Sequence, residues 1–337
     1  MDGSPAPGRI HALDALRGLA ICGIMLVNTW QHALSYRRST DIDWVMGNLF
    51  QSRFYPIFSF LFGVGFALFL RSARSRTAWP RVALLRRLAV LALIGLVHSW
   101  ANPGEVLLPY ALLGATILLP VSFLPAPLIL LIGVGATVPA ILTGEPYVLI
   151  AALFLLGMGG VAYGAAVRRA MPAAFVVAAV LDAALTWWWN HSPPGGGVYQ
   201  AGALCGAVAY GTGFLLLVRS TASKTAVRRT TVFEALGRMA LTNYVSSTAV
   251  ILAAAPLLTA DGTGVAVVGV SAATLAVQAA FSRWWLARYR YGPLEWVWRC
   301  LTWWEPVPNR QTGTRDSSSP VPDPRRPRSE GEPRDRP

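Results

Sequence analysis

Apolar runs of about 20 residues recur along the chain and are separated by short polar segments. A run of this length crosses the hydrocarbon core of a bilayer as an α-helix, because each helical residue adds about 1.5 Å. The pattern predicts an all-α fold, a polytopic integral membrane bundle of about ten transmembrane helices. The predicted spans are residues 14–34, 50–70, 84–100, 105–122, 126–143, 147–167, 173–189, 198–218, 233–258 and 264–286.

Basic residues occur in every second connection between the spans. The basic connections include residues 71–87, 168–169, 219–229 and 288–290. Almost no basic residue occurs in the alternate connections, 101–104, 143–146, 190–197 and 259–263. Because basic loops stay in the cytoplasm, this alternation predicts an even number of spans with both termini cytoplasmic.

Composition supports the membrane interpretation. Hydrophobic residues make up 54% of the chain and charged residues only 13%, whereas soluble domains carry about 25% charged residues. The net charge of +13 lies in loops and in the tail, so we expect the bilayer as the partner and no nucleic acid. The three cysteines and four histidines are dispersed without metal-ligand spacing, and we therefore expect no metal site.

Four regions follow from these patterns. We expect a disordered N-terminus at 1–8 and the transmembrane bundle at 9–290. Residues 291–305 contain four tryptophans after Pro293, which is typical of an amphipathic helix at the membrane interface. Residues 306–337 are rich in Pro, Arg and Ser and lack apolar periodicity, so they predict a disordered cytoplasmic tail.

The first span contains four polar residues that share one helical face. Asp14 and His32 are 18 positions apart and have the same angular phase, and Arg17 and Asn28 lie within about 60° of it. Charged groups at membrane depth face the protein interior, so we expect this stripe to face the bundle. The alternatives are an anchoring pair of Asp14 with Arg17 at the interface and a solvated His32.

A histidine and a carboxylate lie close together in sequence at the predicted outer face. His98 ends the third span and Glu105 opens the fourth. A carboxylate that orients an imidazole is the minimal arrangement for general-base chemistry. The same pair suits a proton relay in a transporter or a solvated loop contact. Arg87 lies 11 positions before His98, on the same helical face but toward the cytoplasm.

Two more spans contain polar residues. The ninth contains Arg238 near its start and Asn243 one turn and a half later, and polar side chains there either bind a substrate or join helices. Asp182 in the seventh span is an intramembrane acid, which by itself suggests a functional site. The sequence identifies no partner for Asp182.

Five ordered motifs carry a resemblance to a known family. They are RIHALDALRGLAICGIMLVN (9–28), FYPIFSFLFGVGFAL (54–68), RRLAVLALIGLVHSWANPGEVLLPYALLG (86–114), LGRMALTNYVSS (236–247) and RYGPLEWVWRCLTWW (290–304). The chain resembles the YeiB-like family of bacterial membrane proteins, which carry the domain of unknown function numbered 418. The resemblance implies a multi-pass protein of the bacterial plasma membrane.

That family is in turn distantly similar to membrane acyltransferases that move acetyl groups onto sugars. Those enzymes share an opening like LDALRG (13–18), but their late histidine corresponds to Asn28 here. The resemblance therefore implies that the base is His32 or His98. Glu105, in GEVL (104–107), keeps the carboxylate that follows this histidine. The resemblance to these acyltransferases also implies acyl-CoA as the acyl donor and cofactor.

Three functions follow as hypotheses. In the first, His98, Glu105 and His32 are catalytic in an acyltransferase that acts on an envelope glycan or lipid. The residues expected to bind its substrates are Asp14, Arg17, Asn28, Arg87, Arg238 and Asn243. In the second, Asp14, Asp182 and Glu105 serve a transporter or permease for a small molecule or lipid. In the third, the protein is a structural membrane component without turnover.

Overall fold

The computed structural model describes residues 10–34, 41–102, 104–192, 196–220 and 232–311. Most of these residues are helical, and the only β-type pairing among them is an isolated antiparallel bridge between Tyr289 and Arg310. The predicted disordered ends at 1–8 and 312–337 lie outside the described residues.

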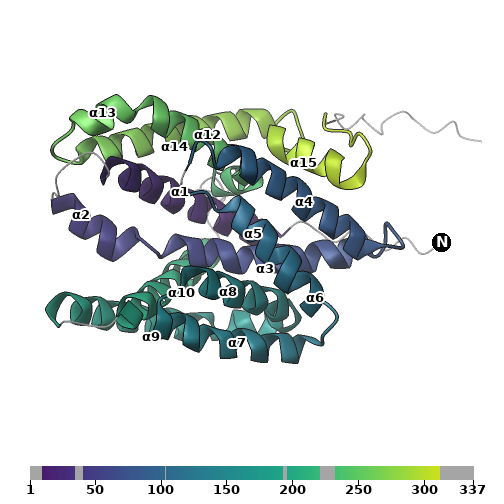
Figure 1. Ribbon diagram of the computed structural model, residues 1–337, viewed down its shortest axis with the longest axis horizontal. Coiled ribbons are helices and arrows are strands. Elements are labelled where there is room, and N and C mark those ends of the chain that lie inside the picture. Colours follow the sequence, from purple (N-terminus) through teal and green to yellow (C-terminus); the bar gives the residue numbers. More distant parts are fainter. Residues whose placement is uncertain (1–9, 35–40, 103, 193–195, 221–231, 312–337) are drawn as a thin grey trace, which may run out of the picture.

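The helices lie along the long axis of the molecule in three layers (Figure 1). The middle layer contains α1 (His11–Leu34), α2 (Asp41–Val45), η1 (Met46–Phe50), α3 (Phe54–Ala73), α4 (Pro80–His98), α5 (Leu107–Leu113), η2 (Gly114–Leu118) and α6 (Leu119–Val121). The lower layer contains α7 (Ala126–Thr143), α8 (Pro146–Gly160), η3 (Val161–Tyr163), α9 (Gly164–His191) and α10 (Gly196–Ser220). The upper layer contains α12 (Ala240–Ala253), α13 (Ala255–Ala260), α14 (Val265–Leu286) and α15 (Pro293–Trp303).

Helix length and composition confirm an all-α, multi-pass membrane protein. Six helical stretches of the described chain are long and apolar enough to cross a bilayer, and the apolar segments Leu107–Val121 and Ala240–Ala253 are shorter. Each of the ten predicted spans coincides with helix. The boundary between the predicted spans 147–167 and 173–189 lies earlier than expected, at η3, because Gly159, Gly160 and Gly164 weaken the helix there.

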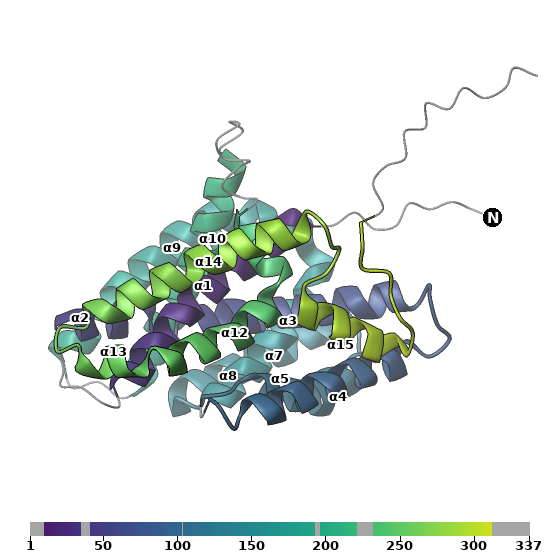
Figure 2. The ribbon, with the colours of Figure 1, turned by 90° about the horizontal axis from the view of Figure 1, so that it is seen from above.

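The main core cluster joins α3, α4, α5 and α8. Phe66, Leu84, Tyr110 and Phe154 are among its buried side chains. Seen from above, α12, α14 and α15 cover α1 and α3 (Figure 2). The layers therefore enclose α1 and α3.

Glycines allow the closest helix crossings. A Cβ atom on Gly63 would collide with the carbonyl oxygen of Phe154, and one on Gly157 with that of Phe60, so α3 and α8 meet backbone to backbone. Gly18 and Gly237 play the same role between α1 and the helical segment 232–238. This second crossing brings the LDALRG and LGRMALTN motifs together.

The predicted ninth span is interrupted at Met239, which separates the segment 232–238 from α12. The break leaves backbone groups without helical partners. Asn243 Nδ2 donates to the carbonyl of Leu236 (3.1 Å) and to Ser282 Oγ (3.3 Å), which satisfies one of those carbonyls. The single helix expected over 233–258 was therefore wrong, and the polar LTN sequence explains how the break is tolerated.

The last helix packs across the end of the bundle where α1 and α12 begin, which we call the inner end. Trp298 Nε1 donates to the carbonyl of Arg87 (2.7 Å), so α15 is fixed to α4. Residues 306–311, assigned by the sequence to the tail, return along the same end. Trp296 Nε1 donates to the carbonyl of Val307 (2.7 Å), and Arg290 N to that of Asn309 (2.7 Å).

Candidate functional site

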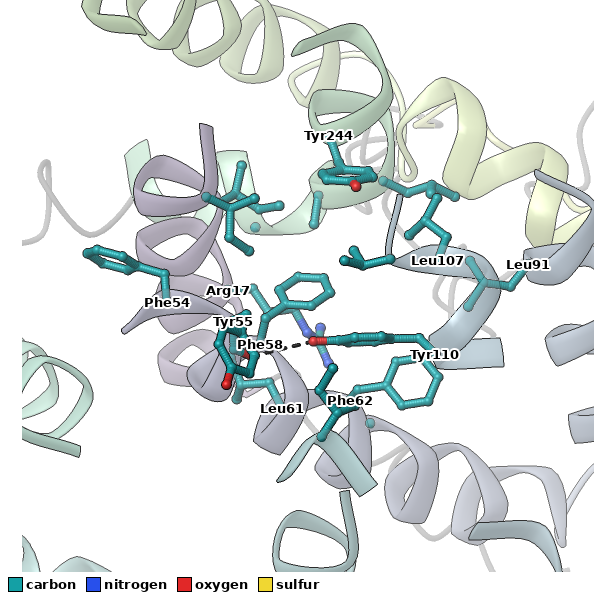
Figure 3. Close-up of a pocket in the computed structure, with 18 of the residues that line it drawn as sticks. Arg17, Phe54, Tyr55, Phe58, Leu61, Phe62, Leu91, Leu107, Tyr110 and Tyr244 are labelled. Carbon is teal, nitrogen blue, oxygen red and sulfur yellow. Dashed lines mark hydrogen bonds between the residues drawn. The ribbon is translucent and has the colours of Figure 1, made fainter. Parts of the chain in front are cut away.

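A cavity of about 480 Å³ lies between the layers, within the usual size range of small-molecule sites. Its walls come from α1, η1, α3, α4, α5, α8, α12, α15, the segment 232–238 and the outer loops at 51–52 and 104–106. Figure 3 shows the rings of Phe58, Phe62 and Tyr110 on one side of the cavity and Tyr244 on the other. The cavity divides into a charged inner end, an apolar middle and a polar, uncharged outer end.

The inner end brings together five ionisable residues from four parts of the chain. They are Asp14, Arg17, Arg87, Arg238 and Glu295. Arg17 Nη1 donates to Asp14 Oδ1 (3.2 Å), so the predicted i,i+3 pair forms within the cavity wall. Arg238 Nη2 donates to the carbonyl of Arg290 (3.1 Å). The inner end is the only zone of this cavity wall that contains charged side chains.

Arg87 is held by aromatic faces. Its guanidinium carbon lies 3.6 Å from the ring centroid of Trp298 and 5.1 Å from that of Phe69. Within the described part of the chain, Arg87 has neither a hydrogen-bonding side-chain partner nor an ion pair. Stacking orients the cation but leaves its donors unsatisfied, so the group is suited to an anionic ligand.

Glu295 caps a helix of the cavity wall. Its Oε1 accepts from the amides of Leu241 (2.7 Å) and Thr242 (3.1 Å), and its Oε2 accepts from the Thr242 hydroxyl (2.6 Å). These groups form the first turn of α12, whose amides the Met239 break exposes. Burial raises the pKa of Glu295 above its ordinary range, and these hydrogen bonds partly oppose that shift.

Aromatic and aliphatic side chains line the middle of the cavity. Phe58, Phe62 and Tyr110 form one wall, and the centroids of the last two are 5.5 Å apart with the rings edge to face. The Tyr110 hydroxyl is hydrogen bonded to Ser59 Oγ (2.6 Å). This zone can hold an extended apolar chain without offering it a charged partner.

The outer end is lined by amides, hydroxyls and rings. Its polar members are Asn28, Gln31, Gln51, Ser52 and Tyr147. Three of the four residues of the predicted stripe in the first span, Asp14, Arg17 and Asn28, therefore line a single cavity at its two ends. His32 does not line it, and its Nδ1 contacts the carbonyl of Asn28 (2.9 Å).

His98 and Glu105 form a close pair beside the cavity. His98 Nδ1 lies 3.6 Å from Glu105 Oε1, and His98 Nε2 lies 2.9 Å from Thr248 Oγ1. The Glu105 carboxylate also accepts from the amides of Leu107 and Leu108 (2.8 Å for the latter), which begins α5. The structure thus brings the two predicted catalytic residues together, and their catalytic role stays a prediction.

Tyr244 separates this pair from the cavity. Its ring centroid lies 5.1 Å from that of His98, and Tyr244 lines the cavity whereas His98 and Glu105 do not. The predicted substrate residue Asn243 also lies outside the lining, where it bridges the Met239 break. The cavity wall and the predicted residue set therefore overlap at Asp14, Arg17, Asn28, Arg87 and Arg238.

Sequence reasoning missed the partner of Asp182. Arg53, only 2% exposed, donates from Nη2 to Asp182 Oδ1 (2.8 Å) and to Thr186 Oγ1 (3.0 Å). Its aliphatic stem lies against Gly206, where a Cβ would come within 3.0 Å of it. The two residues are 129 positions apart, and the only available signal was an arginine immediately before an apolar run. In the described ranges, no three metal-ligating side chains cluster.

Comparisons with known proteins place this chain among uncharacterised relatives. A family model described as "Protein of unknown function (DUF418)" matches residues 160–305. An uncharacterised 39.9 kDa protein of Bacillus acidopullulyticus is 32% identical over 342 residues, covering 90% of this chain and 96% of the relative. The uncharacterised protein YxaH of Bacillus subtilis (strain 168) is 26% identical over 388 residues, covering 89% of this chain and 96% of that relative. No solved structure matches significantly.

Proposed function

The chain belongs to the DUF418 family of proteins of unknown function, and we propose that this multi-pass membrane protein is an acyltransferase of the bacterial plasma membrane. The donor in this proposal is a cytoplasmic acyl thioester such as acyl-CoA. The acceptor is a glycan or lipid of the envelope. The family name supplies no activity, so the proposal rests on the chain's own residues.

One observation carries the proposal, namely a single cavity whose charged, apolar and uncharged polar zones follow one another. An acyl thioester has the same order of groups, with an anionic carrier, an extended arm and a reactive acyl group at its end. Arg87 and its neighbours at the inner end suit the carrier, and the rings around Tyr110 suit the arm. Asn28 and Gln51 at the other end offer hydrogen bonds to an acceptor hydroxyl.

The predicted base is His98, whose Nδ1 lies 3.6 Å from Glu105 Oε1 and would have to come closer for the carboxylate to orient the imidazole. In the proposed reaction the acceptor hydroxyl attacks the thioester carbonyl, the carbon–sulfur bond breaks and the hydroxyl proton passes to His98. The departing thiolate then takes up a proton. Because Tyr244 lies between His98 and the cavity, its ring has to swing aside before the transfer.

Comparison of envelope glycans and lipids tests the proposal. Cells with and without the protein are analysed by mass spectrometry for an acyl group that is present only when the protein is made. Cells that make His98→Ala should lose this group as the deletion strain does, whereas His191→Ala is a matched control because His191 ends α9 in an exposed position. An unchanged acyl pattern in the His98→Ala strain would remove His98 as the base.

A second candidate function, a permease for an amphipathic anion, is favoured by one specific observation. Neither His98 nor Glu105 lines the cavity, and its two carboxylates are engaged with Arg17 and with α12. Transport needs the cavity but no base, and the break at Met239 is the kind of interruption found beside transporter sites. Purified protein in liposomes distinguishes the two candidates, since a permease moves its ligand unchanged and an acyltransferase leaves an acylated product.

A further inference from the structure

We propose that the inner end of the cavity binds a phosphoryl head group, held by Arg87 of α4 and Arg299 of α15. The inference deepens the proposed function, because it names the chemistry of the group that enters the cavity. It uses the same cavity, but it does not depend on whether acyl transfer follows binding.

The inner end of the cavity has more arginines than carboxylates. The inner end of the lining contains three arginines and two carboxylates. The Asp14 carboxylate is paired with Arg17, and the Glu295 carboxylate is taken up by the first turn of α12. Among the described residues, neither carboxylate forms an ion pair with Arg87. The wall therefore keeps a positive charge at a depth where an uncompensated cation is costly.

Arg299 adds a second cation of the same kind. Within the described residues its Nε is buried and has no hydrogen-bond partner, and its guanidinium lies 4.8 Å from the ring centroid of Tyr291. Arg299 does not itself line the cavity, but it directly follows Trp298, the residue whose ring stacks on Arg87. Two arginines are thus held by aromatic rings and lack a carboxylate, at the point where α15 meets α4.

The type of anion follows from the donors. Each guanidinium presents several N–H groups in a planar fork, which matches two oxygens of a carboxylate or phosphate. Two forks on different helices need more acceptor oxygens and more charge than one carboxylate supplies. A phosphate or diphosphate supplies both, and the stacked rings of Trp298 and Tyr291 keep the guanidinium planes oriented before the anion arrives.

A phosphoryl group can reach this site from two sources, a soluble phosphorylated carrier or a phospholipid head group. The purified full-length chain in phosphatidylcholine nanodiscs is titrated with inorganic pyrophosphate in one arm, and phosphatidic acid is added to the nanodiscs in the other. Binding is followed by the thermal unfolding midpoint and by calorimetry. Binding of pyrophosphate alone indicates a soluble carrier, and binding of phosphatidic acid alone indicates a lipid.

We expect Arg87→Gln or Arg299→Gln to weaken binding of the effective probe about 10- to 100-fold, because each removes charged hydrogen bonds to the phosphoryl oxygens. Arg299→Lys keeps the charge without the fork and should fall between the wild type and Arg299→Gln. Arg288→Gln is the matched control, since Arg288 stacks on Trp284 on an exposed part of the same end. Binding of neither probe, or equal losses in the Arg288 and Arg299 variants, would overturn the inference.

These outcomes are separable from those of the proposed function. Arginine-dependent phosphoryl binding without any acylated product leaves this inference in place and removes acyl transfer. Acylated product formed at wild-type rate by both Arg87→Gln and Arg299→Gln keeps acyl transfer and removes the phosphoryl site.

Discussion

Two arginines inside the helix bundle have opposite surroundings. Arg53, next to α3, donates to the Asp182 carboxylate, to Thr186 and to the carbonyl of Gln51 (3.3 Å). Arg87, in α4, has aromatic faces around it but no carboxylate. The pocket beside Arg53 has a volume of only about 10 Å³, whereas Arg87 lines one of about 480 Å³.

The comparison shows how an intramembrane charge should be interpreted. A cation paired with a carboxylate in a filled environment joins helices, here α3 with the α9–α10 hairpin. A cation without a counter-charge beside a cavity is suited to bind something that comes from outside the protein. Both arginines lie inside the bundle, so position inside the bundle does not by itself distinguish structure from function.

The largest expected effect comes from breaking the Arg53 pair. Asp182→Asn keeps the side-chain shape but leaves the buried Arg53 cation without its partner, which should lower the free energy of unfolding by about 3–5 kcal/mol. Thermal unfolding in detergent checks the loss. The double variant Arg53→Met/Asp182→Leu removes both charges and should recover much of the stability, and no recovery would mean that the pair is not what holds these helices.

A somewhat smaller loss is expected where the glycines hold the charged inner end together. Gly237→Ala places a methyl group against the α1 backbone near Asp14 and should cost about 1–3 kcal/mol. Gly269→Ala in α14 meets open space and should be neutral or stabilise by about 1 kcal/mol through helix propensity. Chemical denaturation of both variants gives the difference. Equal effects would argue against a close crossing at Gly237.

The dependence of stability on pH should report on Glu295. Its folded-state pKa is raised above the ordinary 4.5, so its contribution is fully present below about pH 4.5 and is lost as the pH rises through the folded-state pKa. The slope is at most about 1.4 kcal/mol per pH unit. The unfolding midpoint of Glu295→Gln should depend less on pH than that of the wild type.

Asp261, in the loop before α14, provides the control of opposite sign. Hydrogen bonds, chiefly from Thr263, lower the pKa of Asp261 to about 2. Its stabilising contribution is therefore present above its unfolded-state pKa and is lost as the pH falls toward 2. Asp261→Asn should change the pH dependence of stability only in this acidic range. A change above pH 4.5 would show that the two carboxyl groups are not independent.

The smallest expected change in stability is that of Arg87→Gln. Loss of the stacking on Trp298 destabilises the protein, and removal of an uncompensated cation stabilises it, so the net change should stay within about 1 kcal/mol. Thermal unfolding of this variant beside Asp182→Asn completes the comparison of the two arginines. A loss as large as that of Asp182→Asn would place Arg87 with Arg53 among the structural residues.

The spacing of apolar and polar residues along the chain predicted more of this structure than the search for interacting side chains did. Apolar runs set the ten helical segments, and the angular phase of the first span predicted that Asp14, Arg17 and Asn28 share one inward face. Both results depend on local spacing, which one helix specifies by itself. Closeness in sequence likewise predicted that His98 and Glu105 meet.

The remaining features depend on contacts between distant segments. Arg53 meets Asp182 only because the α9–α10 hairpin packs beside α3, and nothing in either local sequence encodes that contact. Glu295 reaches α12 only because the helix breaks at Met239. Tyr244 hides His98 from the cavity, which no spacing rule predicts. Patterns in a single sequence predict which face of a helix is polar and where a helix ends. They do not predict which side chains meet across the bundle, because those contacts depend on the tertiary fold.

The capping of α12 by Glu295 has a consequence for biogenesis. Translation delivers α12 about fifty residues before α15, so the first turn of α12 enters the membrane with its amides unsatisfied. The inner wall of the cavity stays incomplete until the ribosome has released residues 293–303. Nascent chains stalled before Pro293 should therefore be recognised by membrane quality control as unfinished, even though every spanning helix has already been inserted.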